Sequence, residues 1–352
     1  MSTINTRAWQ LAFSLNRQSV LGTAIADGQL NKMRPTRNFV PIIEEIPAKI
    51  SDSEWYGKGH TWATFADRVQ TRLKINSQER SATSLELLYA AAMVMGNVVS
   101  VQPGSGSSAN EWRHTVTFQD VITQKYVIPT TMMQKMGTEF QEKIPGCWIN
   151  SFTIRGVMED HVQLAFEGGA RGPRVASVAA FPAMSTASFY KTLYGRAYAG
   201  PVLGGAPAEI SASVLSFELT ATQNAQPIPL MGNPAGEEML TTEVLIGKQA
   251  VSGNIVVKVD NAMRGWFTNQ NQIAFKLALI SPDVIDNSKH QCWIDIPVVI
   301  LDQESMGEQG STTTYTLNID PNGVLKIGNG ATDPFKMTFI TNISNTELLV
   351  NA

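Results

Sequence analysis

The chain has 352 residues, of which 43% are hydrophobic and 16% are charged, and its formal net charge is −3. Soluble domains usually carry about 25% charged residues, so much of the polar surface must consist of Ser, Thr, Asn and Gln. Tight electrostatic binding of nucleic acid is excluded, because it requires clusters of Lys and Arg and the densest basic stretch is only Arg171–Arg174. The length predicts roughly two domains.

No segment of the sequence predicts export or membrane insertion. Met1–Arg7 lacks the apolar stretch of a signal peptide. The longest apolar stretch, Leu87–Val101, is interrupted by polar residues and is too short to span a bilayer. The two cysteines, Cys147 and Cys292, cannot form a disulfide framework. We therefore expect synthesis in a reducing cytoplasm, with free thiols and no membrane partner.

Residues 1–67 are expected to form an N-terminal arm and loop. Three prolines between Arg34 and Ile50 favour an extended segment over packed strands. The segment Ser53–Trp62 is rich in aromatic residues and glycine, and it is expected to be an ordered loop that leads into the first long strand.

Residues 68–167 are expected to form a first β unit. Alternation from Val69 to Ile75 predicts a half-buried strand with a cationic, solvated face. Leu85–Met95 has apolar residues at helical spacing, follows a capping box that begins at Thr83, and is followed by Gly96 as a C-terminal cap. Three further strands are predicted at His114–Gln119, Cys147–Ile154 and His161–Phe166, the last two joined as a hairpin.

Residues 168–210 are expected to be a loop between two units. Paired glycines alternate there with the aromatic residues Phe189, Tyr190, Tyr194 and Tyr198. Loops of this length are uncommon and usually functional, and exposed aromatic rings usually mark a contact. The loop, with the arm 34–62, is therefore expected to connect neighbouring subunits; a disordered surface loop is the alternative.

Residues 211–345 are expected to form a second β unit that repeats the first, before a C-terminal tail, 346–352. Its elements are Gly253–Val259, a short helix at Asn261–Thr268, Ala274–Leu279, Cys292–Val299 and Thr313–Ile319. Both cysteines begin a Cys-Trp-Ile-(Asn/Asp) tetrapeptide at the same place in each unit. The sequence thus predicts a duplication in which Cys147 and Cys292 are equivalent; chance similarity is the alternative.

Residues with reactive side chains do not form a recognisable catalytic, cofactor-binding or metal-binding pattern. No histidine stands at ligand spacing from another, and neither cysteine has a partner at zinc spacing. Gly104–Gly106 resembles half a phosphate loop but lacks its lysine. The acidic pairs lie in expected loops or turns: Glu44-Glu45, Glu159-Asp160 and Glu237-Glu238. We expect a building block with no cofactor rather than an enzyme.

The segment Ile144–Arg155, with the following Val162–Gly168, resembles the central hairpin of the tail tube proteins of long-tailed, siphovirus-type bacteriophages. Other short segments are similar to further strands of that family, namely Ala8–Phe13, Gly22–Ala24, Val251–Asp260 and Ile294–Pro297. The similarity spans most of residues 8–340 but contains no single diagnostic motif, and residues 168–208 have no counterpart in it.

The resemblance implies a mainly β fold of two tandem antiparallel β-sandwich or barrel units, each with a short α-helix. Strands of neighbouring subunits would close a barrel around a channel. Relatives with one unit form sixfold rings, so two units per chain imply trimeric, pseudo-hexameric rings that stack into a tube.

The same resemblance implies a virion protein of the phage tail, synthesised in the cytoplasm of the host bacterium. Its partners would be other copies of the chain, the tape measure protein in the lumen, the terminator and the baseplate. Double-stranded DNA would pass into the host without sequence recognition, along a neutral to acidic channel.

Two other functions remain open. A tail terminator or baseplate hub would share the fold but would not stack on itself. A β-sandwich carbohydrate-binding module would use the aromatic segment Ser53–Trp62 as its binding platform and would be a monomer or a small closed oligomer.

Overall fold

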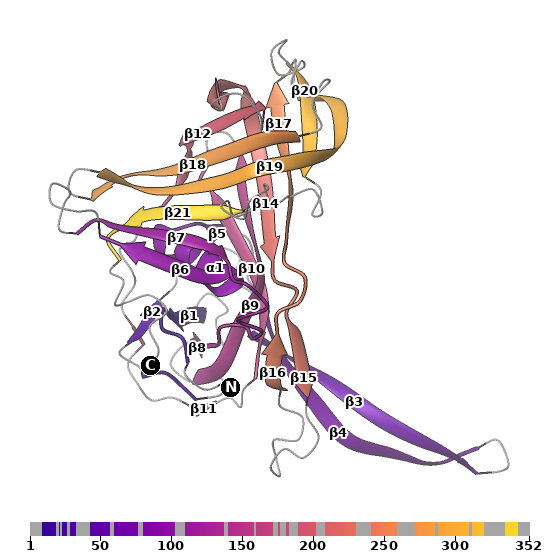
Figure 1. The fold of residues 1–352 in the computed structure, drawn as a ribbon. Coiled ribbons are helices and arrows are strands. Elements are labelled where there is room, and N and C mark those ends of the chain that lie inside the picture. The colour runs from indigo at the N-terminus through magenta and orange to yellow at the C-terminus, as the bar shows by residue number, and fades with distance from the viewer. Residues whose placement is uncertain are drawn as a thin grey trace.

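Strands dominate the fold, and they run in two directions that cross (Figure 1). The computed structural model describes residues 9–18, 21, 23–26, 29–32, 43–56, 60–76, 80–102, 110–136, 140–157, 160–171, 175–176, 181–182, 189–201, 208–229, 241–258, 272–285, 288–309, 312–319 and 335–343. The mainly β, antiparallel fold predicted from the sequence is confirmed.

The larger sheet contains a continuous antiparallel series of eight strands. Their order is β3 (Ile43–Tyr56), β4 (His60–Asn76), β10 (Gln163–Ala170), β9 (Phe140–Val157), β14 (Val214–Thr222), β17 (Ala250–Lys258), β20 (Thr312–Ile319) and the C-terminal half of β19 (Ser288–Gln309). The N-terminal part of β9 also pairs with β8 (Thr130–Met136) and β11 (Val175–Ala176), and β8 continues to β1 (Trp9–Ser14) and β2 (Leu30–Lys32).

The first four strands of this series and the last four follow the same order. In each set the first two strands along the chain are neighbours, the fourth lies beside the second, and the third lies outermost. The two sets join where β9 pairs with β14, with Ser216 opposite Val157 and Thr222 opposite Ser151.

A second antiparallel series crosses the first. It runs through β6 (Gly96–Val101), β7 (Trp112–Phe118), β21 (Lys336–Thr341), the N-terminal half of β19, β18 (Gln272–Ile285), β12 (Lys191–Pro201) and β13 (Ala208–Glu209). β19 therefore begins in the second series and ends in the first. In Figure 1 its orange ribbon passes in front of the upright strands and curls back beside β20.

The helix α1 (Ser84–Met95) is buried along its whole length between the two series. The N–H of Glu86 donates to the Thr83 hydroxyl at 3.1 Å, and Gly96 ends the helix with a φ of 84°, where a side chain would be strained. The predicted helix is confirmed with its cap at Thr83. After Ser84 and Glu86 in its first turn, α1 is apolar on every face, which matches this position because no face meets water.

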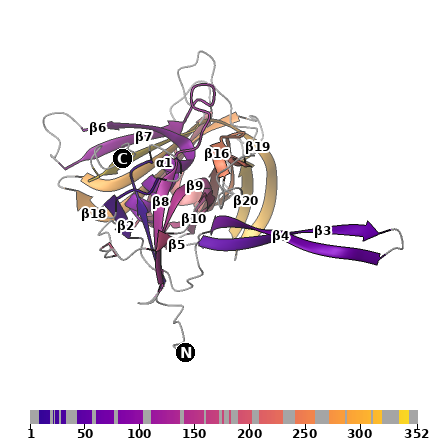
Figure 2. The ribbon, with the colours of Figure 1, turned by 90° about the horizontal axis from the view of Figure 1, so that it is seen from below.

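β3 and β4 form a long hairpin that extends away from the rest of the molecule (Figures 1 and 2). β4 pairs with β10 only at Leu73–Asn76. The sequence predicted an arm that ends at residue 67 and a loop at 53–62, but residue 67 falls inside β4, and residues 53–56 and 60–62 belong to β3 and β4. Pro47 lies within β3 opposite Thr71 of β4, so a proline did not prevent strand formation here.

Part of the stretch expected as a loop, 168–210, is regular structure. β10 continues to Ala170, and Lys191–Pro201 forms β12, which pairs with β18. Tyr190, expected to be exposed, is fully buried, and Phe189 packs against the ring of His161 at 5.5 Å. Alternation fails here because β12 bulges between Lys191 and Arg196.

The strands on either side of Cys147 correspond only in part to those on either side of Cys292. Cys147 pairs with Thr130 of β8 and Ala170 of β10, whereas Cys292 pairs with Leu279 of β18 and Phe339 of β21. The preceding strand thus lies beside each cysteine, but the second neighbour differs. The helix expected at 261–268 and the tail 346–352 lie outside the described residues, and the division into two units stays a prediction.

Candidate subunit interface

The series of eight strands ends in two open edges. In the part of the chain that the structure describes, β3 pairs only with β4, and residues 301–309 of β19 pair only with β20. Open edges carry unpaired N–H and C=O groups and readily accept another strand. A projecting two-stranded hairpin is also only marginally stable by itself in water. Both features indicate surfaces that another chain covers.

The outer face of the middle strands of this sheet, β10, β9, β14 and β17, is polar and carries little net charge. Partly exposed Ser, Thr and Asn side chains cover β9, β14, β17 and β20, and the hydroxyls of Thr153 and Thr220 lie 2.8 Å apart. On β10, residues 149–157 of β9, β14 and β17, the charged side chains are two cations, Arg155 and Lys258, and two carboxylates, Glu167 and Glu218. Arg155 stands directly opposite Glu218 in the strand register.

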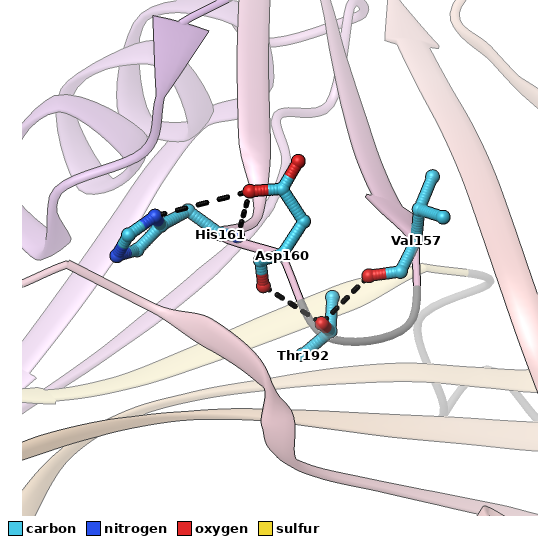
Figure 3. Close-up of polar contacts among 4 residues, drawn as sticks. All are labelled: Val157, Asp160, His161 and Thr192. Atoms are coloured by element: carbon cyan, nitrogen blue, oxygen red, sulfur yellow. Dashed lines mark hydrogen bonds and ion pairs between the residues drawn. The ribbon is translucent and has the colours of Figure 1, made fainter.

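A bulge on β12 is fixed to the turn between β9 and β10 (Figure 3). The Thr192 hydroxyl oxygen lies 2.7 Å from the Val157 carbonyl and 2.7 Å from the Asp160 carbonyl. The Thr192 N–H also donates to the Asp160 carbonyl at 3.1 Å. The Asp160 carboxylate accepts the N–H of His161 at 2.7 Å, and the Asp160 N–H donates to the Val157 carbonyl at 3.3 Å, which joins the two strand ends at this turn.

The fixed bulge presents apolar side chains to solvent beside an apolar pocket. Leu193 is 69% exposed, Val157 41% and Tyr194 39%. The pocket has a volume of about 260 Å³, and Arg196 is the one charged residue that lines it. Other lining residues are mostly apolar and come from β9, β12, β14 and β18, including Gly156, Ala197, Val214, Phe217, Leu277 and Leu279.

His114, His161 and His290 lie in different parts of the fold and have different surroundings. His114 is buried between Ser100, whose hydroxyl lies 2.8 Å from Nδ1, and the Ile343 carbonyl, 2.8 Å from Nε2. Burial lowers the pKa of His114, and the Ile343 carbonyl raises it by less. Burial also lowers the pKa of His290, against a smaller opposing effect of Asp283. His161 lies at the β9–β10 turn, and the side chain of His60 lies outside the described residues.

Both cysteines are buried and neither forms a disulfide, which fits structural thiols. Burial is the main cause that raises the pKa of each thiol, so neither is an activated nucleophile. Among the described residues, no group of three or more His, Cys, Asp or Glu side chains is placed to hold a metal ion. No helix in the described part of the chain is long and apolar enough to cross a membrane.

A family model described as phage tail tube protein matches residues 67–325, more than half of the chain. The chain belongs to the phage tail tube protein family. No curated protein is significantly similar to it. The family resemblance drawn from the sequence is confirmed, and with it a structural role in the tail tube of a phage virion, together with copies of itself and other tail proteins. The siphovirus type stays an expectation.

Sequence reasoning missed the features that make up this interface. The sequence predicts a strand that ends at residue 299, before the edge formed by residues 301–309 of β19, and it predicts a loop where β12 bulges. One usable signal was present at the turn after β7, where Val121 and Ile122 follow Asp120. Such turns normally carry polar residues.

Proposed function

We propose that the chain forms closed rings by pairing the β19 edge of one copy with the β3 edge of the next. The repeated strand order supports this pairing. Within one chain, the third strand of the first set, β9, pairs antiparallel with the first strand of the second set, β14. β19 and β3 hold the same two positions at the open ends. Closure leaves no free edge, and a heterologous contact closes a ring when the rotation fits.

Three copies would complete the ring. Each copy contributes two four-strand sets, so a trimer would present six sets with pseudo-sixfold symmetry. The division of the chain into two tandem units is part of this proposal, and the matching order of the two sets supports it.

The outer face of the eight-strand series would line the channel, and stacked rings would form the tube through which phage DNA enters the host. On the four middle strands of that face, β10, β9, β14 and β17, the equal number of cations and carboxylates supports this role. DNA that meets no cluster of Lys or Arg releases no counterions, so it is not held in place. The tape measure protein would occupy the lumen until DNA passes through it, and the terminator and baseplate would close the two ends of the tube. The chain itself would have no enzymatic activity.

Cysteine cross-linking tests the ring contact. Pairs of cysteines, one at residues 44–48 of β3 and one at residues 303–307 of β19, should form disulfides in at least one register. Denaturing gels should then show covalent ladders that end at the trimer, because closure needs three contacts. Cys147 and Cys292 do not interfere, since both are buried.

The matched control pairs a cysteine at Val99, an exposed position on β6, with one at residue 305; it should give no ladder. Tubes that form without a cross-link in any register would place the ring contact elsewhere. A ladder that continues to the hexamer, or strict sixfold symmetry of the ring, would contradict the two-unit division.

Electron microscopy of the purified protein separates the tube from related functions. The proposal expects hollow tubes of stacked rings. Isolated rings that never stack would instead indicate a terminator or baseplate hub, and a persistent monomer would overturn the proposed ring.

A further inference from the structure

An apolar side chain projects from the turn that follows β7. Ile122 is 81% exposed, the largest exposure among the exposed large hydrophobic residues of the described chain, and Val121 beside it is 40% exposed. The Asp120 carboxylate accepts the Ile122 N–H at 2.9 Å, and the Asp120 carbonyl accepts the Thr123 N–H at 3.1 Å. The turn is therefore internally bonded, and it holds Ile122 outward. No feature of the isolated chain explains this exposed side chain.

The turn and the apolar pocket lie at opposite ends of β14. The pocket is lined by Val214, where β14 begins. β14 ends at Thr222, and the chain then enters β15 (Gln226–Pro229), which pairs with β16 (Thr241–Leu245). The segment after the turn attaches to β16, because the Val127 N–H donates to the Val244 carbonyl at 3.0 Å. Figure 1 shows β12 and the start of β14 above, and β15 and β16 below.

We propose that Ile122 of one copy inserts into the apolar pocket beside the β12 bulge of a second copy in the next ring. The inference rests on the proposed stacking of rings. The two surfaces are complementary in polarity, because one offers the exposed aliphatic side chain of Ile122 and the other offers an apolar cavity of about 260 Å³. Their charges are complementary too, since Asp120 is the charged residue of the turn Asp120–Thr123, and Arg196 is the charged residue that lines the pocket.

The position of the two surfaces also fits continued growth. A contact between different surfaces at opposite ends of a molecule does not close on itself, so it repeats from ring to ring. The bulge has the rigidity that such a contact needs, because Thr192 fixes it to the carbonyls of Val157 and Asp160. In this proposal, the contact between subunits that the sequence predicts for the loop 168–210 lies at the bulge, residues 192–195.

Single substitutions on each surface test the contact. Ile122→Asp should leave folded rings that no longer stack, because it places a charge in the apolar pocket. Leu193→Asp at the rim of the pocket should have the same effect. The matched controls are Ile122→Val, which keeps an aliphatic side chain, and Val99→Asp, which adds a charge at another exposed position; both should form tubes. Circular dichroism and thermal melting would verify that each variant folds. Ile122→Ser is a second variant that removes the aliphatic side chain without adding a charge, and it should also fail to stack.

A mixture of the two defective variants gives a sharper test. Ile122→Asp rings keep an intact pocket, and Leu193→Asp rings keep an intact Ile122. Each variant alone should sediment as single rings, whereas the mixture should give pairs of rings and no longer stacks, by analytical ultracentrifugation and electron microscopy. Tubes of normal length from either variant, or a mixture that stays as single rings while both controls stack, would overturn the inference. If the wild-type protein formed no rings at all, the proposed function itself would fail, a different outcome from tubes that tolerate these substitutions.

Discussion

Single polar side chains hold the ends of strands in place in this molecule. Thr192 is the clearest case, because its one hydroxyl lies within hydrogen-bonding distance of two carbonyl groups, of Val157 and Asp160, in the turn of another hairpin. A buried or partly buried hydrogen bond contributes about 1 kcal/mol to stability. Loss of the Thr192 hydroxyl should therefore destabilise the bulge more than the rest of the fold.

Thr192→Val keeps the shape of the side chain and removes the hydroxyl. We expect the free energy of unfolding to fall by about 1 kcal/mol, and hydrogen exchange at residues 191–196 to accelerate more than in α1. Thr338→Val, at a partly exposed position on β21, is the control and should change neither quantity. Equal exchange rates in the two variants would show that the hydroxyl does not hold the bulge.

His114 should make stability depend on pH. Burial lowers the pKa of His114 in the folded protein from its ordinary value of 6.5, so the unfolded chain binds a proton more readily. Its contribution to stability is therefore complete above about pH 6.5 and is lost as the pH falls through the lower pKa of the folded state. Melting temperatures between pH 7.5 and pH 5 would measure the decline.

The variant His114→Gln removes the titrating ring. We expect a loss of about 1–3 kcal/mol at pH 7.5, where buried hydrogen bonds to Ser100 and Ile343 are disturbed, and a weaker decline toward pH 5. His290 also has a lowered pKa and supplies the remaining dependence. An unchanged slope in His114→Gln would assign the pH dependence to other groups.

At the scale of elements, α1 was predictable and the strands at the edges were not. α1 carries its own signals, a cap at Thr83, apolar residues at helical spacing and Gly96 at its end. β12 escaped prediction because four residues bulge out of register. An extended arm was expected here because of Pro47 in β3 and two prolines before it, and nothing in the sequence of β3 states that β4 lies beside it. Strand pairing is set by distant contacts, which local patterns do not contain.

The cap of α1 gives a prediction at this scale. Thr83→Ala removes the oxygen that accepts the Glu86 N–H, so the free energy of unfolding should fall by about 0.5–2 kcal/mol. Thr83→Ser keeps the oxygen and should recover most of the loss. Chemical denaturation of both variants would measure it. Equal stability of the alanine and serine variants would mean that packing, not the cap, holds this end of the helix.

At the scale of the whole molecule, the sequence indicated the family and a structural role but no particular surface. Low charge content and the absence of a catalytic pattern are properties of the entire chain, so they could be read without a structure. The candidate interface could not, because it is made of backbone edges and of a pocket between four strands. A role for the exposed residue Ile122 can be proposed only when the pocket at the other end of β14 is known.

The junction of β9 with β14 also limits how assembly can go wrong. In the proposed ring, every second contact between four-strand sets is already made inside a chain. Only the remaining contacts have to form between separate chains. A ring closed from whole chains then holds an even number of sets. Rings of five or seven sets, the nearest errors available to a chain with one set, cannot be built. The covalent link thus limits the tube to the bores of rings with an even number of sets, and it removes the two sizes nearest to six.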